Sequence, residues 1–403
     1  MSKPAIVCKF GGSSLDSADM FRKVAEIVCR RKDEGFHVVV VVSAAGTTTD
    51  RLIKELREFS DVRNPREMDM YISSGERMSA AIMSMVLRDF GKKAISLTGS
   101  QAGIITDDNH NNARIIDVRP ARIKHCLQED NIVVVSGFQG VSFKKEVTTL
   151  GRGGSDVTAV ALAQSIGAKK CEIYSDVDGV FDADPRIISS ASLIGEMNYE
   201  EMQELSEAGA CVLHPAAVEF AKKNGTEIFC KNTTSPEKYG TVIKNLKDRY
   251  PPGIRGIASE KNIVLVHVWD GNSIKLQTVK KVLKFCENNR IKVKQTTFHR
   301  GQGSQMVGSF IISEKEHYDL QFFLKEMDNI FKGSVDIHEG YSAVSLIGTG
   351  ITAHMDYIID AVELLSKNDI SVGSFHTSSF RISLLVRCEH MKQTVSLLHD
   401  KYI

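Results

Sequence analysis

The 403-residue sequence lacks a long apolar run, an excess of charge of one sign and any CxxC pair. Its longest uniform apolar stretch, residues 38–42, has the length of a β-strand, whereas a membrane-spanning helix needs about 20 apolar residues. The 51 Lys and Arg residues balance 50 Asp and Glu residues, which argues against a nucleic-acid-binding protein. Because the first residues run directly into a strand pattern, we expect no signal peptide. These absences predict a cytoplasmic protein that binds neither nucleic acid nor membrane.

The sequence also lacks the marks of disorder and of a disulfide framework. Hydrophobic residues make up 42% of the chain, and no low-complexity tract or block of like charge occurs. The eight cysteines are scattered, and several, such as Cys8 and Cys171, lie inside apolar patterns. Thiols in such positions are typical of small core residues in a reducing compartment. At about 150 residues per domain, the length predicts two to three domains.

Short β-rich runs alternate with helical patterns in the first part of the chain. Continuous Val and Ile runs suit strands that are buried on both faces, and their alternation with helices predicts an α/β sheet covered by helices. The candidate strands are residues 6–10, 38–42, 94–97, 132–136, 171–175 and 227–231, and the candidate helices are residues 18–34, 66–90, 120–129, 155–166 and 215–224.

After a proline-containing segment at residues 248–253, which we interpret as a hinge, the sequence repeats itself. Ile291 and Ile370 are equivalent positions 79 residues apart, each within the order strand, helix, strand, strand, helix. This order predicts two small βαββαβ domains. The first copy has a further strand candidate at residues 335–338, and the second copy lacks one. We expect residues 254–259 to supply it, because an unfilled sheet edge exposes unpaired backbone groups.

Three glycine-bearing loops, each after a candidate strand, carry the first sign of chemistry. They are residues 9–14 (Lys-Phe-Gly-Gly-Ser-Ser), residues 43–50 and residues 151–156 (Gly-Arg-Gly-Gly-Ser-Asp). Glycine lets backbone N–H groups approach an anion, and the start of a helix offers further N–H donors. One such loop is common in ordinary turns, but three on one side of an α/β unit, with Lys9 in the first, predict phosphate binding. Neither GxxxxGK[ST] nor GxGxxG after the first strand is present.

Residues 174–186 form a fourth notable segment, rich in Asp. Its Asp, Gly and Pro residues suit an acidic turn. A calcium loop is disfavoured because the closing Glu of that motif is missing. A nucleotide loop also suits the segment, with its carboxylates near Mg²⁺ and Arg186 near phosphate.

Together with residues 73–77 (Ser-Ser-Gly-Glu-Arg), 98–103 and 136–140, these segments resemble the aspartate kinases of the amino acid kinase family. The resemblance covers nearly the whole chain, and the order and spacing of its motifs are specific. It implies an α/β fold, with an amino acid kinase-type α/β/α sandwich in residues 1–247. Two ferredoxin-like ACT domains, which sense small molecules, would follow at residues 260–338 and 339–403.

The resemblance also implies an activity. The γ-phosphoryl group of ATP, bound with Mg²⁺, would pass to the side-chain carboxylate of L-aspartate, the first step towards lysine, threonine and methionine. A carboxylate with an ordinary pKa near ~4 is ionised at neutral pH, so the reaction needs no general base. Positioning and positive charge would supply most of the catalysis. Lys9 matches the invariant lysine of the family and Asp156 its catalytic aspartate, which we expect to orient Lys9.

The binding residues implied by the resemblance fall into two sets. For L-aspartate, Arg152 can grip a carboxylate with two hydrogen bonds and Glu76 can accept the α-ammonium group. The full aspartate set is Ser13, Thr49, Glu76, Arg152, Gly153, Gly154 and Ser155. The ATP set is Lys9, Phe10, Gly11, Gly12, Ser43, Ser155, Tyr174, Ser175, Val180, Phe181, Asp182, Ala183, Asp184, Pro185, Arg186 and Lys231. No residue is assigned as a metal ligand.

The resemblance further implies a homodimer joined through the ACT domains and an amino-acid effector, lysine or threonine or both. Some positions depart from the family pattern. Ala216 stands where an Arg is usual, and Lys294 stands where an acidic residue is usual. A cationic effector such as lysine would therefore meet less negative charge near Lys294. We interpret His214 as a residue that starts a helix rather than as a ligand.

Two other functions compete with this one. The same fold could take glutamate, acetylglutamate or another small acid as acceptor, although Arg152 and Glu76 together favour a free amino acid. The chain could instead be an idle ligand sensor or partner subunit, a hypothesis that the intact Lys9, Arg152 and Asp156 oppose.

Overall fold

A computed structural model describes residues 3–60, 62, 64–210, 212–246, 252–270, 276–300, 306–317, 320–353 and 355–403. The described residues fall into two compact units. The first lies within Met1–Phe181, Ser192–Glu207 and Cys211–Arg249, and the second within Asp182–Ala191, Ala208–Ala210 and Tyr250–Ile403. Of the expected hinge, residues 248–251 lie outside the described residues.

The first unit is built on an eight-stranded sheet with the order β10-β12-β11-β9-β1-β2-β6-β3. All the neighbouring strands are parallel except β11 and β12. The strands are β1 (Ala5–Phe10), β2 (His37–Val42), β3 (Ala94–Leu97), β6 (Ile132–Ser136), β9 (Lys170–Ser175), β10 (Glu196–Met197), β11 (Glu227–Asn232) and β12 (Thr241–Ile243). All six strands expected for this part of the chain are present, so the predicted α/β sheet is confirmed.

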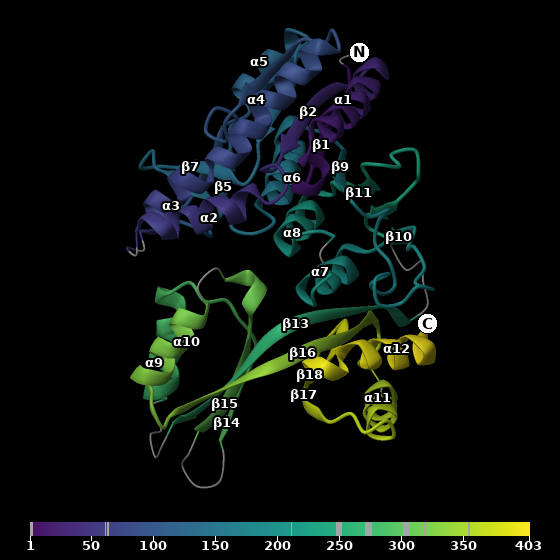
Figure 1. The fold of residues 1–403 in the computed structure, drawn as a ribbon. Helices are drawn as coiled ribbons and strands as arrows, with labels where there is room; N and C mark the ends of the chain where they lie inside the picture. The colour runs from purple at the N-terminus through teal and green to yellow at the C-terminus, as the bar shows by residue number, and fades with distance from the viewer. Residues whose placement is uncertain are drawn as a thin grey trace. The chain divides into compact units, whose positions relative to one another are not determined.

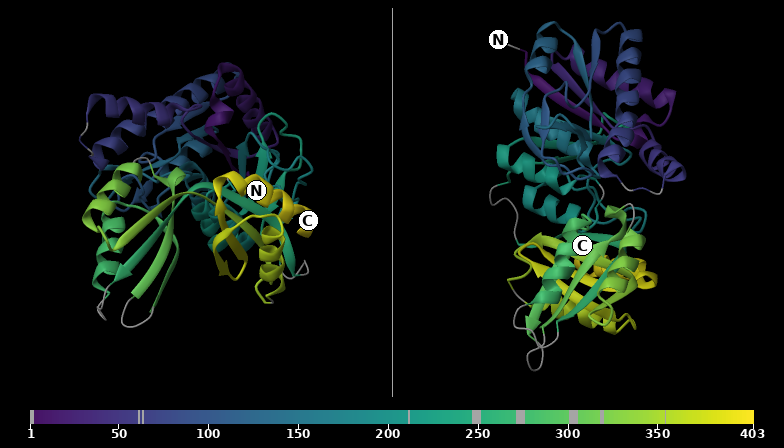
Figure 2. Two further views of the ribbon diagram at one scale, coloured as in Figure 1. Left: turned by 60° about the horizontal axis from the view of Figure 1, so that its bottom comes forward. Right: turned by 90° about the vertical axis from the view of Figure 1, so that its left-hand side faces the viewer.

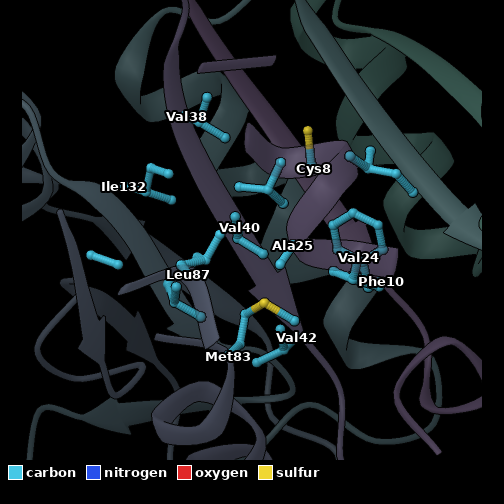
Figure 3. Packing of buried hydrophobic residues seen from close by; sticks show 14 of the residues in the cluster. Cys8, Phe10, Val24, Ala25, Val38, Val40, Val42, Met83, Leu87 and Ile132 are labelled. Carbon is cyan, nitrogen blue, oxygen red and sulfur yellow. The ribbon is translucent and has the colours of Figure 1, made fainter. Parts of the chain in front are cut away.

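Helices cover both faces of this sheet. The helices of the unit are α1 (Ala18–Asp33), α2 (Thr48–Phe59), α3 (Pro65–Ile72), α4 (Ser74–Asp89), α5 (Ala121–Gln128), α6 (Gly154–Ile166), α7 (Tyr199–Glu207) and α8 (Pro215–Asn224). On one face, Cys8 and Val40 pack with Val24 of α1 and with Met83 and Leu87 of α4 (Figure 3). On the other face, α6 packs against β1, β2 and β9, and α8 packs on α6.

The alternation of side chains along β1 decides where the chemistry lies. Cys8 and Phe10 point into the cluster under α1 and α4. Because successive side chains of a strand point to opposite faces, Lys9 points to the α6 face. Lys9 is also near the carboxyl end of a central parallel strand, the edge at which ligands bind in open α/β sheets.

The predicted single helix over residues 66–90 is wrong, because the structure has two helices there. α3 ends at Ile72 and α4 begins at Ser74. The carbonyl oxygen of Ser73, between them, accepts a hydrogen bond from the side-chain amide of Gln139. The apolar periodicity runs on through Ser73, so the pattern alone does not reveal the break.

Sequence reasoning also missed several smaller elements. α2 begins inside the loop expected at residues 43–50, and α7 was not expected. A four-stranded sheet of order β5-β4-β7-β8 was also missed. Its strands are β4 (Ile104–Thr106), β5 (Ile115–Val118), β7 (Gln139–Ser142) and β8 (Val147–Thr149). With three or four residues each, they are too short to show a period of two.

The second unit contains the two predicted repeats. Its six-stranded sheet has the order β14-β15-β13-β16-β18-β17. The elements are β13 (Gly253–Asp270), α9 (Gln277–Asn288), β14 (Val293–Arg300), β15 (Met306–Ser313), α10 (Leu320–Ile330), β16 (Val335–Thr349), α11 (Asp356–Ser366), β17 (Val372–Ser378), β18 (Arg381–Arg387) and α12 (Met391–Tyr402).

Two long strands run through both repeats, where separate strands had been expected. β13 and β16 lie side by side along their length in Figures 1 and 2. Residues Gly253–Glu260 pair with the half of β16 that belongs to the second repeat, and residues Val264–Val268 pack in the first. Register shifts between Glu260 and Leu265 divide the two halves of β13. Each repeat keeps its own core, under α9 and α10 or under α11 and α12.

The described residues include neither a membrane-spanning helix nor a disulfide. Among the described residues, no helix is long and apolar enough to cross a membrane. The described cysteines are all free thiols, and six of the seven are buried.

Leu87 gives a direct test of the packing under α4. It is fully buried, whereas Met85 on the same helix is 68% exposed. Leu87→Ala should lower the free energy of unfolding by about 2–5 kcal/mol through lost burial and the cavity left behind. Met85→Ala should change it by no more than about 0.5 kcal/mol. Urea unfolding followed by circular dichroism measures both, and equal losses would contradict this packing.

Candidate functional site

The centre of the candidate site is an ion pair between Lys9 and Asp156. Lys9 lies on β1, and Asp156 lies in the first turn of α6. The Lys9 Nζ is 2.6 Å from the Asp156 Oδ1, and both side chains are largely buried, with 12% and 8% of their area exposed. A buried lysine held by one carboxylate has a fixed position, so it can face an anion at the end of β1.

Asp156 has a second partner that sequence reasoning missed. The backbone N–H of His214 donates a hydrogen bond to its Oδ2, over 3.2 Å. His214 is the N-cap of α8, and its Nδ1 accepts a hydrogen bond from the backbone N–H of Ala216. This agrees with the interpretation of His214 as a residue that starts a helix. No sequence signal exposes the bond to Asp156, because a backbone group makes it.

The first two glycine loops and the start of α4 lie against one another. A Cβ atom on Gly12 would be 2.8 Å from the carbonyl oxygen of Gly46 in the second loop. A Cβ atom on Gly75 would be 2.8 Å from the Cβ of Ala44. Larger residues at Gly12 and Gly75 would therefore force these segments apart. The close approach brings Glu76, in the first turn of α4, to the loop that follows β2.

Glu76 is a buried carboxylate with an unused acceptor. Only 3% of the residue is exposed, and its Oε1 accepts a hydrogen bond from the backbone N–H of Ala44. Its Oε2 is buried and has no hydrogen-bond partner among the described residues. Burial raises the pKa of Glu76 to about 7. A buried carboxylate oxygen without a partner suits a cationic group of a ligand.

Arg152 and the turn around it form another wall of the site. The Arg152 side chain is about half exposed, and its Nη2 lies 3.7 Å from the Asp50 Oδ1 on α2. Thr49 is in the first turn of the same helix. Gly153, with φ +70°, precedes α6, so the first N–H groups of that helix follow Arg152 directly. A guanidinium beside helix N–H groups can bind a carboxylate or a phosphate.

Phe10 and Tyr174 are placed so that only their backbones are available to a ligand. Both side chains are fully buried and stack on each other, with ring centroids 4.7 Å apart. The Tyr174 carbonyl oxygen accepts a hydrogen bond from the backbone N–H of Gly11, and the Tyr174 hydroxyl donates to Glu172. Burial raises the pKa of Tyr174 further above its ordinary value. The two stacked rings therefore pack in the core beneath the sheet end that carries the first glycine loop and hold that loop in place.

Lys231 does not share a face of the sheet with Lys9. It is in register with Tyr174, whereas Lys9 is in register with Ile173. Neighbours in register on parallel strands point the same way, so the two lysines point to opposite faces. Burial lowers the pKa of Lys231, and the nearby Glu172 partly offsets this shift.

The acidic segment divides between the two units after Phe181. Val180 belongs to the first unit, where its N–H donates to the hydroxyl of Thr241. Asp182 to Arg186 belong to the second unit. There Asp182 is buried, 3.4 Å from the ring of His399, and Asp184 accepts hydrogen bonds from the exposed Arg186.

The remaining predicted residues lie in the same loops of the first unit. Ser13 is exposed in the first loop, and Ser43 follows the end of β2, where its N–H donates to the Phe10 carbonyl oxygen. Gly154 and the buried Ser155 start α6, and Ser175 ends β9. Among the described residues, no group of three His, Cys, Asp or Glu side chains is arranged to hold a metal ion.

These positions together define what the first unit can do. A buried ammonium group, the N–H groups of a helix start and the glycine loops converge near the carboxyl end of β1. Such an arrangement stabilises a multiply charged anion. Glu76 and Arg152 add the two opposite charges that a free amino acid would need.

Comparisons with known proteins point the same way. The amino acid kinase family matches residues 4–232. An aspartokinase of Geobacillus stearothermophilus is 39% identical over 398 residues, which cover 98% of this chain and 97% of that protein. An aspartokinase of Mycolicibacterium smegmatis is 38% identical over 404 residues, which cover 98% of this chain and 96% of that protein.

Solved structures are similar over the same length. E. coli aspartokinase III in complex with aspartate and ADP, in its R-state, has a TM-score of 0.82 at 25% identity, covering 98% of this chain and 99% of that chain. An aspartate kinase of Clostridium acetobutylicum has the same fold, with a TM-score of 0.67 at 23% identity, covering 99% and 100% of the two chains.

The unused oxygen of Glu76 leads to a prediction about stability. The raised pKa means that the folded protein holds a proton between the ordinary pKa of 4.5 and about 7, whereas the unfolded chain releases it. The unfolded state then binds fewer protons, so the free energy of unfolding falls as pH rises through this window. Glu76→Gln removes this loss and should raise Tm by several degrees at pH 8 but not at pH 4.5.

Differential scanning fluorimetry at both pH values checks this prediction. Glu26→Gln, an exposed position on α1, is the matched control and should leave the pH dependence of Tm as in the parent. If the Tm of Glu76→Gln equals that of the parent at pH 8, the buried carboxylate is not destabilising.

Proposed function

Because this chain belongs to the aspartokinases of the amino acid kinase family, we propose that Lys9 and Asp156 carry the transfer of the ATP γ-phosphoryl group to L-aspartate. The activity is that of an aspartate kinase, with the side-chain carboxylate as acceptor. The residue roles rest on the buried ion pair at the end of β1. That pair is the observation that carries the proposal.

The proposed reaction needs charge neutralisation rather than proton transfer. A carboxylate oxygen of aspartate attacks the γ-phosphorus, the bond to the bridging oxygen breaks, and ADP leaves as 4-phospho-L-aspartate forms. No proton moves, because the attacking carboxylate is already ionised. Lys9 reduces the repulsion between the two anions, with the N–H groups of Gly11 and Gly12 beside it. Asp156 fixes the position of the Lys9 ammonium group.

The substrate contacts follow from the two charges of a free amino acid. Glu76 accepts the α-ammonium group on its unpaired oxygen, and Arg152 binds a carboxylate, with Thr49, Ser13 and the start of α6 nearby. An N-acylated acid would leave Glu76 buried without a cation, which is costly. This observation favours a free amino acid over acetylglutamate, and the relatives favour aspartate over glutamate.

The nucleotide is ATP, in keeping with the ADP complex of E. coli aspartokinase III. Mg²⁺ enters as part of the nucleotide substrate, because this ion usually binds through phosphates with one or two carboxylates. Tyr174, Ser175 and the segment from Val180 to Arg186, with Lys231, are the residues proposed for the nucleotide side. For Tyr174, whose ring is fully buried, the contact would come from the backbone.

The proposed domain division keeps residues 1–247 as catalytic and residues 260–338 and 339–403 as ACT domains, with residues 254–259 as a strand of the second. An amino acid, lysine or threonine or both, regulates the enzyme through these domains. In the first repeat, Lys294 contacts Glu316 and lies 3.3 Å from the buried Glu260. Its charge is therefore balanced within the chain, and a cationic effector would have to compete with it.

Two further proposals concern assembly and location. β14 and β17 are the edges of the second sheet, and their backbone groups suit pairing with a second copy in a homodimer. The free buried thiols suit the reducing cytoplasm.

A coupled assay that follows ADP release with ATP and aspartate tests the function. Glutamate as acceptor tests the competing substrate, and added lysine, threonine or both test regulation. Turnover with aspartate well above that with glutamate is expected. Failure of every amino acid to support turnover would favour the idle-sensor hypothesis.

Lys9→Ala should lower kcat by at least about 10²-fold while the fold is kept, because the charge that brings the anions together is lost. Lys3→Ala is the matched control, since its side chain is half exposed and pairs with Asp130 at the surface. The coupled assay and a circular dichroism spectrum measure the two effects. Full activity of Lys9→Ala would overturn the role proposed for this lysine.

Glu76→Ala should act on the aspartate side alone. Loss of a charged hydrogen bond to the ammonium group predicts a rise in KM for aspartate of about 10-fold or more. The KM for ATP should stay within about two-fold of the parent value. An unchanged KM for aspartate would mean that another group holds the ammonium.

A further inference from the structure

A second buried carboxylate in the catalytic unit has no part in the chemistry above. Asp69, on α3, is fully buried. Its Oδ1 accepts hydrogen bonds from the Thr149 hydroxyl over 2.5 Å and from the Asn111 backbone N–H over 3.0 Å. Its Oδ2 lies 3.1 Å from the same N–H and 2.8 Å from the His110 Nδ1. Burial of a carboxylate is costly unless its oxygens are hydrogen-bonded. Both oxygens of Asp69 have such partners.

The partners of Asp69 are the segments that hold the Arg152 turn. Thr149 ends β8, three residues before Arg152. The Thr149 carbonyl oxygen accepts a hydrogen bond from the N–H of Ala113, which ties it to the segment of His110 and Asn111. A Cβ atom on Gly151 would be 3.0 Å from the side-chain oxygen of Asn112. The same Cβ would be 3.3 Å from the carbonyl oxygen of Asn111, so the turn that carries Arg152 packs on a residue that Asp69 bonds and on its neighbour.

Asp69 is also joined to Glu76 through its own helix. α3 ends at Ile72, and Ser73, which caps it, donates its N–H to the Asp69 carbonyl oxygen; α4 begins at the next residue. Glu76 is in the first turn of α4. The Asp69 side chain thus bonds the segments next to the Arg152 turn, and its backbone leads through Ser73 into α4, which carries Glu76.

We propose that Asp69 is a positioning residue that fixes Arg152 relative to Glu76 and so determines the affinity for the amino-acid substrate. The inference rests on the proposed function. Asp69 does not touch the substrate, and it acts through Thr149 and through the α3–α4 junction. A misplacement of one binding group by a small distance is enough to weaken binding of a small ligand with two charges. The hydrogen-bond partners of the Asp69 side chain among the described residues are Thr149, Asn111 and His110, and none of them is proposed for the nucleotide side.

The test uses a pair of variants that differ only in the hydrogen bond. Thr149→Val removes the hydroxyl, and Thr149→Ser keeps it. Thr149→Val and Asp69→Asn should raise KM for aspartate about 10-fold or more, with KM for ATP within about two-fold of the parent. Thr149→Ser should stay within about two-fold for both substrates. Glu201→Gln, another buried carboxylate on α7, is the control for burial alone and should change neither KM.

Two outcomes would overturn the inference. One is an unchanged KM for aspartate in Thr149→Val, and the other is an equal rise of both KM values. The rate of tryptic cleavage after Arg152 in the folded protein gives a readout that needs no activity, and it should rise in Thr149→Val but not in Thr149→Ser. If the parent does not phosphorylate aspartate, the proposed function is wrong. The cleavage rates alone then decide whether Asp69 holds the turn, and equal rates would reject it.

Discussion

The ion pair between Lys9 and Asp156 is the interaction on which the site depends. Lys9 comes from the central strand of a parallel sheet, and Asp156 comes from the helix that packs on one face of it. The pair exists only because β1 points Lys9 away from the cluster under α1 and α4. A chain that must bring two anions together gains most from a cation that is already fixed in place.

The other buried carboxylates of the catalytic unit have different roles, which depend on their hydrogen-bond partners. Glu172 is held by Arg31 and supports the ring of Tyr174. Asp69 is saturated by hydrogen bonds, which suits a rigid support. Glu76 has a buried oxygen with no hydrogen-bond partner among the described residues, and burial raises its pKa to about 7, which suits a ligand. A buried carboxylate whose oxygens all have hydrogen-bond partners thus supports the fold, whereas one with an unpartnered oxygen is suited to bind a ligand.

The sequence was sufficient to predict the strands of the main sheet and the loops that carry the site, because continuous Val runs and glycine clusters are strong local signals. It was not sufficient for features that depend on tertiary contacts. At the break between α3 and α4 the Ser73 carbonyl oxygen is bonded by the distant Gln139, and the bond from His214 to Asp156 uses a backbone N–H. Asp69 did leave a signal, a charged residue three positions before the buried Ile72 on one helix face.

The second unit shows the same limit. Its repeats were predicted from their spacing, but the union of neighbouring strand segments into β13 and β16 was not. Register shifts near Glu260 allow one strand to serve two cores, and a pattern of period two does not extend across them.

In the proposed mechanism the Lys9 ammonium group lies between the nucleotide phosphates and the substrate carboxylate. A crystal structure of the protein with ADP and aspartate bound tests it most directly. The Lys9 Nζ should lie within hydrogen-bonding distance of a phosphate oxygen while it still pairs with Asp156. A Lys9 side chain that points away from both ligands would contradict it.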